Sequence, residues 1–422
     1  MTSLSCLEPP FWFILVLAAI LLPSLAGADD FRLLPSIMQT VQENDNVLVT
    51  SDHQLHDIVS STTGGLELFE STERFTLNAL GQLSQNLYEH DTKFNSTDDL
   101  GNATIRYVLD PQLALSAAGS YSRTAQPDQE LLTTGLVLTG VTKDSTTFHA
   151  QGDYSLTEKT LASLMYDHGM DHYQNPFISD LTYDTGTLSF THDLSRYLPQ
   201  AKGILNVDYT QYSLTGVEVD NYEATTGFSY SLQEKWSVQA SAGLRRTESS
   251  FDIFVPTGVF IITPFGIAEQ VAQKTESTTG WGGVGQAAIS YKGEVTNASF
   301  TASRDLAPAS GTSGTVERTM FLLSADKRFS YDLHGYFDTG YFINKSNGTQ
   351  FSPTPIDFET LNLSPRIRWE FGRERAAGLQ SLRDMYVEAS YTFTRFEDKI
   401  AQTTAYRNLF LIRFFAQHAV LE

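Results

Sequence analysis

Residues Thr146–Asp167, TTFHAQGDYSLTEKTLASLMYD, contain two alternating runs that are joined by a short polar segment. One face of the first run carries Phe148, Ala150, Gly152, Tyr154 and Leu156, and the other carries His149, Gln151, Asp153 and Ser155. After Thr157-Glu158-Lys159 the alternation resumes with Ala162, Leu164 and Tyr166. A period of two residues is that of a β-strand with one apolar face. The stretch therefore predicts a β-hairpin.

Related hairpin signals recur along the chain. The stretch Tyr230–Ala242, YSLQEKWSVQASA, repeats the pattern, and Tyr107–Gly119, YVLDPQLALSAAG, keeps its outline. Short polar connections alternate with longer ones, which fall near Glu43–His56, Asp91–Asp99, Ala125–Asp144, Asn175–Tyr183, Gly216–Asn221, Phe251–Lys274, Asp305–Thr315, Asn347–Asp357 and Glu397–Thr403. Short turns at one rim and long loops at the other are typical of a bacterial outer-membrane barrel.

The connections separate about 18 strands, an even number of the kind that such barrels show, with 16 as the alternative count. We therefore expect an all-β fold: a transmembrane antiparallel β-barrel with short periplasmic turns, long extracellular loops and both termini at the periplasmic rim. The rival is a soluble β-sandwich, whose outward face would be rich in charge. Several runs suit a tilted membrane span of ~9–11 residues better than the ~5–6 residues usual in a sandwich.

Composition limits the function classes. The 422 residues carry a net charge of −21, which argues against binding nucleic acid through its phosphates. Only 18% of residues are charged, against about 25% in a typical soluble domain. The single cysteine, Cys6, lies in the leader, so the mature chain has no disulfide framework and no cysteine-ligated metal.

The N-terminus predicts export. The apolar run Phe11–Leu22 is too short to span a membrane, and Ala26-Gly27-Ala28 follows as a small-x-small cleavage pattern. Glu8 and the absence of Lys and Arg before the run depart from the usual leader. We expect residues 1–28 to be a signal peptide and 29–422 to form the barrel in the bacterial outer membrane; an uncleaved anchor is the alternative.

Aromatic residues recur beside the short turns, where a ring can face acyl chains while its polar atom reaches the headgroups. We expect this membrane-interface role for Tyr107, Tyr154, Tyr230, Trp236, Tyr291 and Trp369. Ordinary cross-strand packing of aromatic side chains is the alternative.

The polar face of each strand should line the interior, because a charge at the hydrocarbon midplane costs about 2–4 kcal/mol. The candidate pore-lining residues are Arg106, Gln239, Arg245, Gln286, Arg366, Arg368, Glu370, Glu388, Arg407 and Arg413. Mixed-sign rows can tune an aqueous path or form structural ladders across the lumen. A barrel of ~16–18 strands leaves room for water, so the strand count carries the pore inference.

The longest expected loop, Phe251–Lys274, contains an uncharged run from Ile253 to Ala268. It could plug the lumen, hold an apolar ligand, meet another protein, or pair as a β extension above the membrane. The residues that we expect to form such a plug or partner contact are Phe254, Phe260 and Phe265.

Catalytic and metal-binding signals are weak. His168 and His172 would share a face of a strand but lie roughly 13 Å apart, too far to chelate one ion, so we assign them to a surface loop. No nucleophile motif or Walker loop is present, and we expect neither an enzyme nor a cofactor. If the fold placed His149 and Asp153 beside a serine in a cleft of the lumen, an enzymatic function would be favoured instead.

The stretch Leu33–Thr72 contains Glu43-Asn44-Asp45-Asn46-Val47-Leu48 and then Asp57-Ile58-Val59. With the turn Tyr154–Thr160, this resembles the β-barrel porin type 2 family, which includes exosortase-associated outer-membrane barrels. Gly64-Gly65, where that family often has Pro-Gly, and the extension Ala416–Glu422 beyond the last strand depart from it. The resemblance implies an outer-membrane protein, sometimes tied to exopolysaccharide production, that the barrel assembly machinery recognises, here through Phe414 or Phe415.

These observations favour a porin-like passive channel for small hydrophilic solutes. The alternative is a non-enzymatic outer-membrane component of an exopolysaccharide export or assembly system, with export components as partners beside the membrane lipid.

Overall fold

The structure is a computed structural model that describes residues 30–125, 128–137, 141–176, 178–263, 266–309, 314–346, 355–371, 384–418 and 420. The predicted signal peptide, residues 1–28, lies outside the described residues. No helix in the described ranges is long and apolar enough to cross a membrane.

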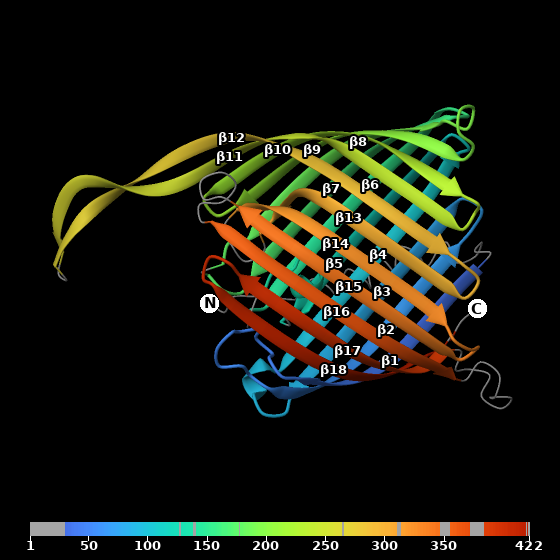
Figure 1. The fold of residues 1–422 in the computed structure, drawn as a ribbon, viewed down its shortest axis with the longest axis horizontal. Coiled ribbons are helices and arrows are strands. Elements are labelled where there is room, and N and C mark those ends of the chain that lie inside the picture. Colours follow the sequence, from blue (N-terminus) through green and yellow to red (C-terminus); the bar gives the residue numbers. More distant parts are fainter. Residues whose placement is uncertain are drawn as a thin grey trace, which may run out of the picture.

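Eighteen antiparallel strands form one closed barrel, which confirms the predicted fold and the strand count (Figure 1). The strands are β1 Asp30–Asn44, β2 Asp57–Ser71, β3 Phe75–Tyr88, β4 Ser96–Asp110, β5 Leu113–Thr124, β6 Lys143–Thr157, β7 Thr160–Tyr173, β8 Leu181–Asp193, β9 Ala201–Leu214, β10 Val217–Leu232, β11 Trp236–Thr263, β12 Gly266–Lys292, β13 Thr296–Pro308, β14 Thr315–Arg328, β15 Leu333–Ser346, β16 Ile356–Phe371, β17 Asp384–Asp398 and β18 Thr403–Gln417. Two short helices, η2 Thr92–Phe94 and α2 Asp128–Thr133, lie in connections.

The barrel closes where β1 pairs with β18, from Ser36 opposite Gln417 to Asn44 opposite Leu409. Each strand otherwise pairs with its neighbours in sequence. The closed sheet satisfies the backbone hydrogen bonds of its strands, which is the condition for crossing a membrane with β-strands.

The outward face of the wall is apolar. Exposed side chains on this face include Leu164, Val207, Leu244, Phe300, Ile367, Phe410 and Ile412. They alternate with inward polar side chains, as the two-residue period of a strand requires. A closed barrel with such a face belongs in the bacterial outer membrane, so the predicted location is confirmed.

The two rims differ in the length of their connections. One rim has the short turns at residues 72–74, 111–112, 158–159, 194–200, 233–235, 293–295 and 329–332, all close to the predicted positions. The connection between β16 and β17 lies outside the described residues. Asp30 and Gln417, the ends of the first and last strands, lie at this rim through their pairing with Ser71 and Ser36.

At the other rim, the predicted loop Gly216–Asn221 is wrong. Strand β10 already begins at Val217, and only Thr215 and Gly216 connect it to β9. Gly216 has a φ of 71°, a left-handed conformation that glycine adopts without steric cost, and this permits so tight a turn.

The expected loop Phe251–Lys274 is instead a continuation of strands β11 and β12. The two strands stay paired from Trp236 opposite Tyr291 to Thr263 opposite Gly266, with one irregularity between Pro256 and Phe260. Beyond the wall they form a long two-stranded ribbon that projects from the rim (Figure 1). The β-extension alternative is therefore the observed one, and the ribbon does not plug the lumen.

The wall overlaps itself beside this ribbon. β12 pairs with β13 only between Gly285 and Lys292, so the two strands separate towards the long-loop rim. There Leu306 of β13 packs in one buried apolar cluster with Tyr212 of β9, Val219 of β10 and Phe251 of β11. The end of β13 thus lies against the inner face of β9–β11.

Candidate functional site

The candidate site is the polar inner face of the barrel. Arg366, Arg368 and Glu370 occupy alternate positions of β16, and the intervening Ile367 and Trp369 are exposed on the outside. The pairing of β16 with β17 and of β17 with β18 brings Glu388, Arg407 and Arg413 onto the same inner face.

Glu388 is the centre of a charged cluster. It is 1% exposed, and its Oε2 accepts hydrogen bonds from Nη2 of Arg368 at 2.8 Å and from Nε at 3.1 Å. Its Oε1 accepts a bond from Nη1 of Arg413 at 3.3 Å. The guanidinium of Arg368 also lies 4.1 Å from the ring centroid of Tyr386. One carboxylate therefore holds two cations on the wall in fixed positions.

A second ion pair lies next to this cluster on the inner wall. Nη2 of Arg366 lies 2.5 Å from Oδ2 of Asp338 on β15, and its guanidinium lies 5.2 Å from the ring centroid of Tyr336. Arg407 of β18 is 1% exposed and is held in the wall. We call Arg366, Arg368, Arg407 and Arg413 the arginine row; Asp338 binds the first of them, and Glu388 binds Arg368 and Arg413.

A cavity of about 740 Å³ lies against this row inside the barrel. Four predicted pore residues, Arg366, Glu388, Arg407 and Arg413, line it together. Most of the remaining lining is hydroxyl and amide side chains, including Thr40, Gln42, Thr63, Asn86, Asn362 and Thr392. The structure therefore joins residues from both ends of the chain into one polar compartment.

The other predicted pore residues face inward elsewhere. Arg245 on β11 is 1% exposed and forms an ion pair with Glu317, which also binds Arg304 at 3.0 Å, across the overlapping part of the wall. Gln239 and Gln286 lie on the same inner face as Arg245, nearer the short-turn rim. Arg106 on β4 is exposed. Glu370 on β16 lies 4.0 Å from His334.

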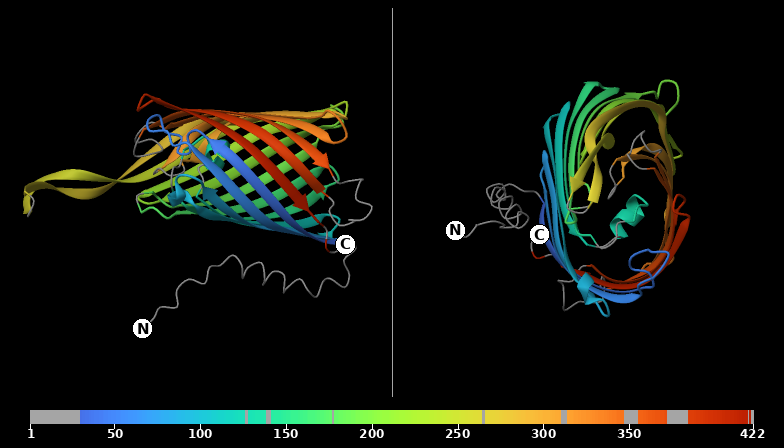
Figure 2. Two further views of the ribbon diagram at one scale, coloured as in Figure 1. Left: turned by 90° about the horizontal axis from the view of Figure 1, so that it is seen from below. Right: turned by 90° about the vertical axis from the view of Figure 1, so that its left-hand side faces the viewer.

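Sequence reasoning missed the segment that narrows the lumen. Helix α2, in the connection between β5 and β6, lies inside the barrel, as Figure 2 shows in an end-on view (teal). Leu132 of this segment is one of the residues that line the polar cavity, together with the arginine row. The signal in the sequence was the apolar content of ELLTTGLV, residues 130–137, in a connection expected to face water.

Three side chains of the far wall hold α2 in place. Nδ2 of Asn362 donates to the carbonyl of Leu131 at 3.0 Å, and Nδ2 of Asn344 donates to that of Thr134 at 3.0 Å. The hydroxyl of Thr360 donates to the carbonyl of Gly135 at 2.5 Å. These bonds satisfy the carbonyl groups at the end of the helix, which have no partner within it.

Apolar contacts complete the anchorage. Leu131 is fully buried and Leu136 is 2% exposed. Gly135 has a φ of 71°, and a Cβ at this position would stand 2.5 Å from Cβ of Phe342. The backbone can therefore approach the wall this closely only at a glycine.

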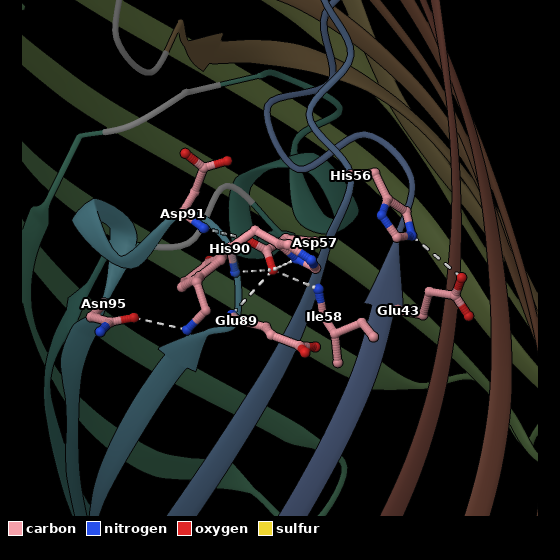
Figure 3. A network of polar contacts seen from close by, with 9 residues as sticks. Glu43, His56, Asp57, Ile58, Glu89, His90, Asp91 and Asn95 are labelled. Atoms are coloured by element: carbon pink, nitrogen blue, oxygen red, sulfur yellow. Dashed lines mark hydrogen bonds and ion pairs between the residues drawn. The ribbon is translucent and has the colours of Figure 1, made fainter.

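Polar networks also fix the loops at the long-loop rim (Figure 3). Oδ1 of the buried Asp57 accepts hydrogen bonds from the backbone N–H groups of Ile58, Glu89 and His90 at 2.7, 3.1 and 3.1 Å. Its Oδ2 accepts one from Asp91 at 2.8 Å. One carboxylate thereby ties the start of β2 to the β3–β4 loop.

The predicted interface aromatics all lie near the short-turn rim on the outward face. Tyr107, Tyr154, Trp236 and Trp369 are exposed, and Tyr230 and Tyr291 are partly buried. The rings of Trp236 and Tyr291 lie 4.8 Å apart, so cross-strand packing occurs as well. Their place at the membrane interface stays a prediction.

The ribbon residues fall at the edge of the described part of the chain. Phe260 is 67% exposed. Phe265 and the side chain of Phe254 lie outside the described residues. A contact of this segment with a partner stays a prediction.

A row of polar side chains near His149 has part of the geometry that an enzyme would need. Nδ1 of His149 lies 2.6 Å from Oδ1 of Asp167, and Oδ1 of Asp153 accepts a bond from the hydroxyl of Ser163 at 2.6 Å. However, Nε2 of His149 contacts Gln151, at 3.4 Å, and not Ser163. A serine nucleophile needs a base within hydrogen-bond reach, and here its hydroxyl is bound to a carboxylate.

His168 and His172 lie within β7 and not in a loop, so that assignment is wrong. Nδ1 of His168 lies 2.8 Å from Asp184, and Nδ1 of His172 lies 2.7 Å from Asp180. Each histidine thus has its own carboxylate partner. Among the residues that the structure describes, no group of three or more potential ligands could hold a metal ion.

The sequence matches no family model and no curated protein. Solved structures of similar shape include OccK2 (OpdF) of Pseudomonas aeruginosa, with 10% identity and a TM-score of 0.47 over 94% of this chain and 100% of that one. OpdQ of Pseudomonas aeruginosa gives 9% identity and a TM-score of 0.46 over 93% and 100% of the two chains. OccAB1 of Acinetobacter baumannii gives 9% identity and a TM-score of 0.45 over 93% and 98%.

Proposed function

We propose that this barrel is a passive channel for small hydrophilic solutes across the outer membrane. The observation that carries the proposal is the 740 Å³ cavity beside α2 and the arginine row, which is lined by charged and hydroxyl side chains. A purely structural interior would be packed by side chains, as it is in barrels of ~8 strands, whereas this interior retains space for water and solute.

The arrangement has the parts that a selective pore requires. The segment with α2 lowers the free cross-section of the lumen, and the wall of β15–β18 holds charges in fixed positions through Glu388 and Asp338. Width and charge at such a constriction decide which solutes pass, and no reaction is needed.

Conductance of purified, folded protein in a planar lipid bilayer tests the proposal. We expect discrete current steps whose size grows with salt concentration, because ions would move through water in the lumen. A mobility shift on heating in detergent shows that the protein is folded. Folded protein that never conducts would refute the channel.

The alternative function, a component of exopolysaccharide export, remains a prediction from the family resemblance. The β11–β12 ribbon offers a surface for such a partner because Val259, Phe260 and Val271 are exposed on it. Co-purification of export components with the intact protein, and their loss on removal of the ribbon, would support it.

A further inference from the structure

A second cavity, of about 590 Å³, lies at the short-turn rim on β9–β12. Lys202, Lys235 and Lys292 line it, and all three are exposed. The cluster is unusual in a chain with a net charge of −21. It is distinct from the compartment beside α2, whose lining comes from other strands.

The fold brings the three lysines together from separate strands. Lys202 is the second residue of β9, Lys235 ends the turn between β10 and β11, and Lys292 ends β12. The backbone N–H of Lys292 donates to the carbonyl of Lys235 at 2.7 Å, so these two residues are direct neighbours. From β9 to β12 the backbones span roughly 14 Å at the usual strand spacing, a distance that flexible lysine side chains can bridge from both sides.

Hydroxyl groups fill the surface between the lysines. Ser231 pairs with Ser237, and Ser237 pairs with Ser290, so the three serines form one row across β10–β12. All three line the cavity. Hydroxyl and ammonium groups both donate hydrogen bonds, so the surface suits an acceptor with many oxygens.

The lysines are not neutralised by acidic side chains. In the part of the chain that the structure describes, none of the three ammonium groups lies within 4.0 Å of a carboxylate oxygen. Glu234 lines the cavity without forming an ion pair there. Asp193 pairs in register with Lys202, but its carboxylate accepts a bond from the N–H of Ser195 at 2.7 Å.

We propose that this cluster is a binding site for a polyvalent oxyanion, a molecule with several phosphate or carboxylate groups, at the periplasmic mouth of the barrel. Three exposed positive charges spread over several strands favour several linked negative groups over a single one, because each lysine then meets its own partner. The site would raise the local concentration of such anions on the periplasmic side. For its effect on current, the proposal rests on the proposed channel function.

Binding is tested first without reference to conduction. Tripolyphosphate is titrated into the full-length folded protein in detergent at low ionic strength, and the heat of binding is measured by calorimetry, with orthophosphate and citrate in parallel. We expect tripolyphosphate and citrate to bind more tightly than orthophosphate, and added salt to weaken binding. Equal affinity for orthophosphate and tripolyphosphate would overturn the assignment to polyvalent anions.

Variants locate the site. Exposed ion pairs contribute modestly, so each of K202Q, K235Q and K292Q should weaken tripolyphosphate binding about threefold, and the triple variant by tenfold or more. The triple exchange to arginine keeps the charge and should retain binding. The matched control is K159Q, which removes a lysine from the β6–β7 turn of the same rim but outside the cavity. Unchanged affinity in the glutamine variants, or an equal loss in K159Q, would overturn the site.

The bilayer gives a second measurement. Tripolyphosphate added at the short-turn side should reduce the current at concentrations that have no effect from the other side, and K202Q/K235Q/K292Q should abolish this asymmetry. A protein that never conducts would refute the channel while calorimetry still decides the site. Block of equal strength from both sides would contradict the proposed location.

Discussion

Glu388 contributes both to the charge of the lumen and to the strength of the wall. Its carboxylate is almost fully buried and binds Arg368 and Arg413. Removing this carboxylate leaves two partly buried cations without this acceptor, which costs more than the bonds contribute while intact.

We expect Glu388→Gln to shift the channel towards anions and to lower the free energy of unfolding by about 1–3 kcal/mol. The shift follows because the substitution removes a negative charge beside Arg368 and Arg413, whose positive charges remain. The reversal potential under a salt gradient in the bilayer measures selectivity, and urea titration in lipid vesicles measures stability.

The matched control is Glu359→Gln. Glu359 accepts a bond from the hydroxyl of Tyr341 at 2.9 Å and pairs with Lys399, away from the cavity. It loses the same charge, so an equal shift in both variants would mean that total charge, and not the lumen cluster, sets selectivity.

At the scale of elements, the position of α2 depends on close contact with β15 and β16. Its carbonyl groups are bound by Asn344, Thr360 and Asn362, and Gly135 meets Phe342. A side chain at Gly135 would collide with Phe342, and its left-handed backbone would cost about 1–2 kcal/mol in alanine.

Gly135→Ala should therefore displace α2 from the wall and give larger or more variable single-channel currents, while the barrel stays folded. Single-channel recording measures the effect. Gly64→Ala is the control, because a Cβ there meets no atom within 4 Å. Currents identical to the wild type in Gly135→Ala would show that this contact does not set the width of the pore.

The β11–β12 ribbon is an element with little support from the barrel. Beyond Phe251 its first strand has no pairing with β10, and before Gly285 its second strand has none with β13. An isolated two-stranded hairpin is marginally stable in water, and unpaired edges are sites of association.

Removal of residues 255–272, with Phe254 joined to Gln273 through an Asn-Gly turn, should leave folding and conductance unchanged. Folding is read from the mobility shift on heating in detergent, and conductance from the bilayer. A barrel that no longer folds would assign the ribbon a structural role.

For the whole molecule, closure depends on the seam between β1 and β18. Asp45, directly after β1, accepts bonds from both the N–H and the Nδ2 of Asn408, each at 2.7 Å. Asn46 donates to the carbonyl of Tyr406 at 2.9 Å. The Asn-Asp-Asn segment that carries part of the family resemblance thus fastens the first loop to the last strand.

Asp45→Ala should weaken this seam by about 1–3 kcal/mol, since two donors on β18 lose their acceptor. A lower urea midpoint in lipid vesicles would report it. Asp52→Ala, at an exposed position of the same loop, should leave the midpoint unchanged. If neither substitution changes the urea midpoint of unfolding, backbone pairing alone closes the seam.

The sequence by itself determined the barrel, an approximate count of 18 strands, the short turns and the division into outward and inward faces. These features are local: a two-residue alternation and a polar turn can be recognised within ten residues, and the membrane imposes the same pattern on every strand. Local patterns were also sufficient to find the arginines of β16 and β18.

Only the tertiary structure decided what fills the lumen and how the wall overlaps. The bond between Asn362 and Leu131 and the packing of Leu306 on Tyr212 join residues that are far apart in the chain. The gathering of three lysines at one mouth likewise follows from strand order and register. Such contacts arise from closure of the whole sheet, and no alternation along one strand encodes them.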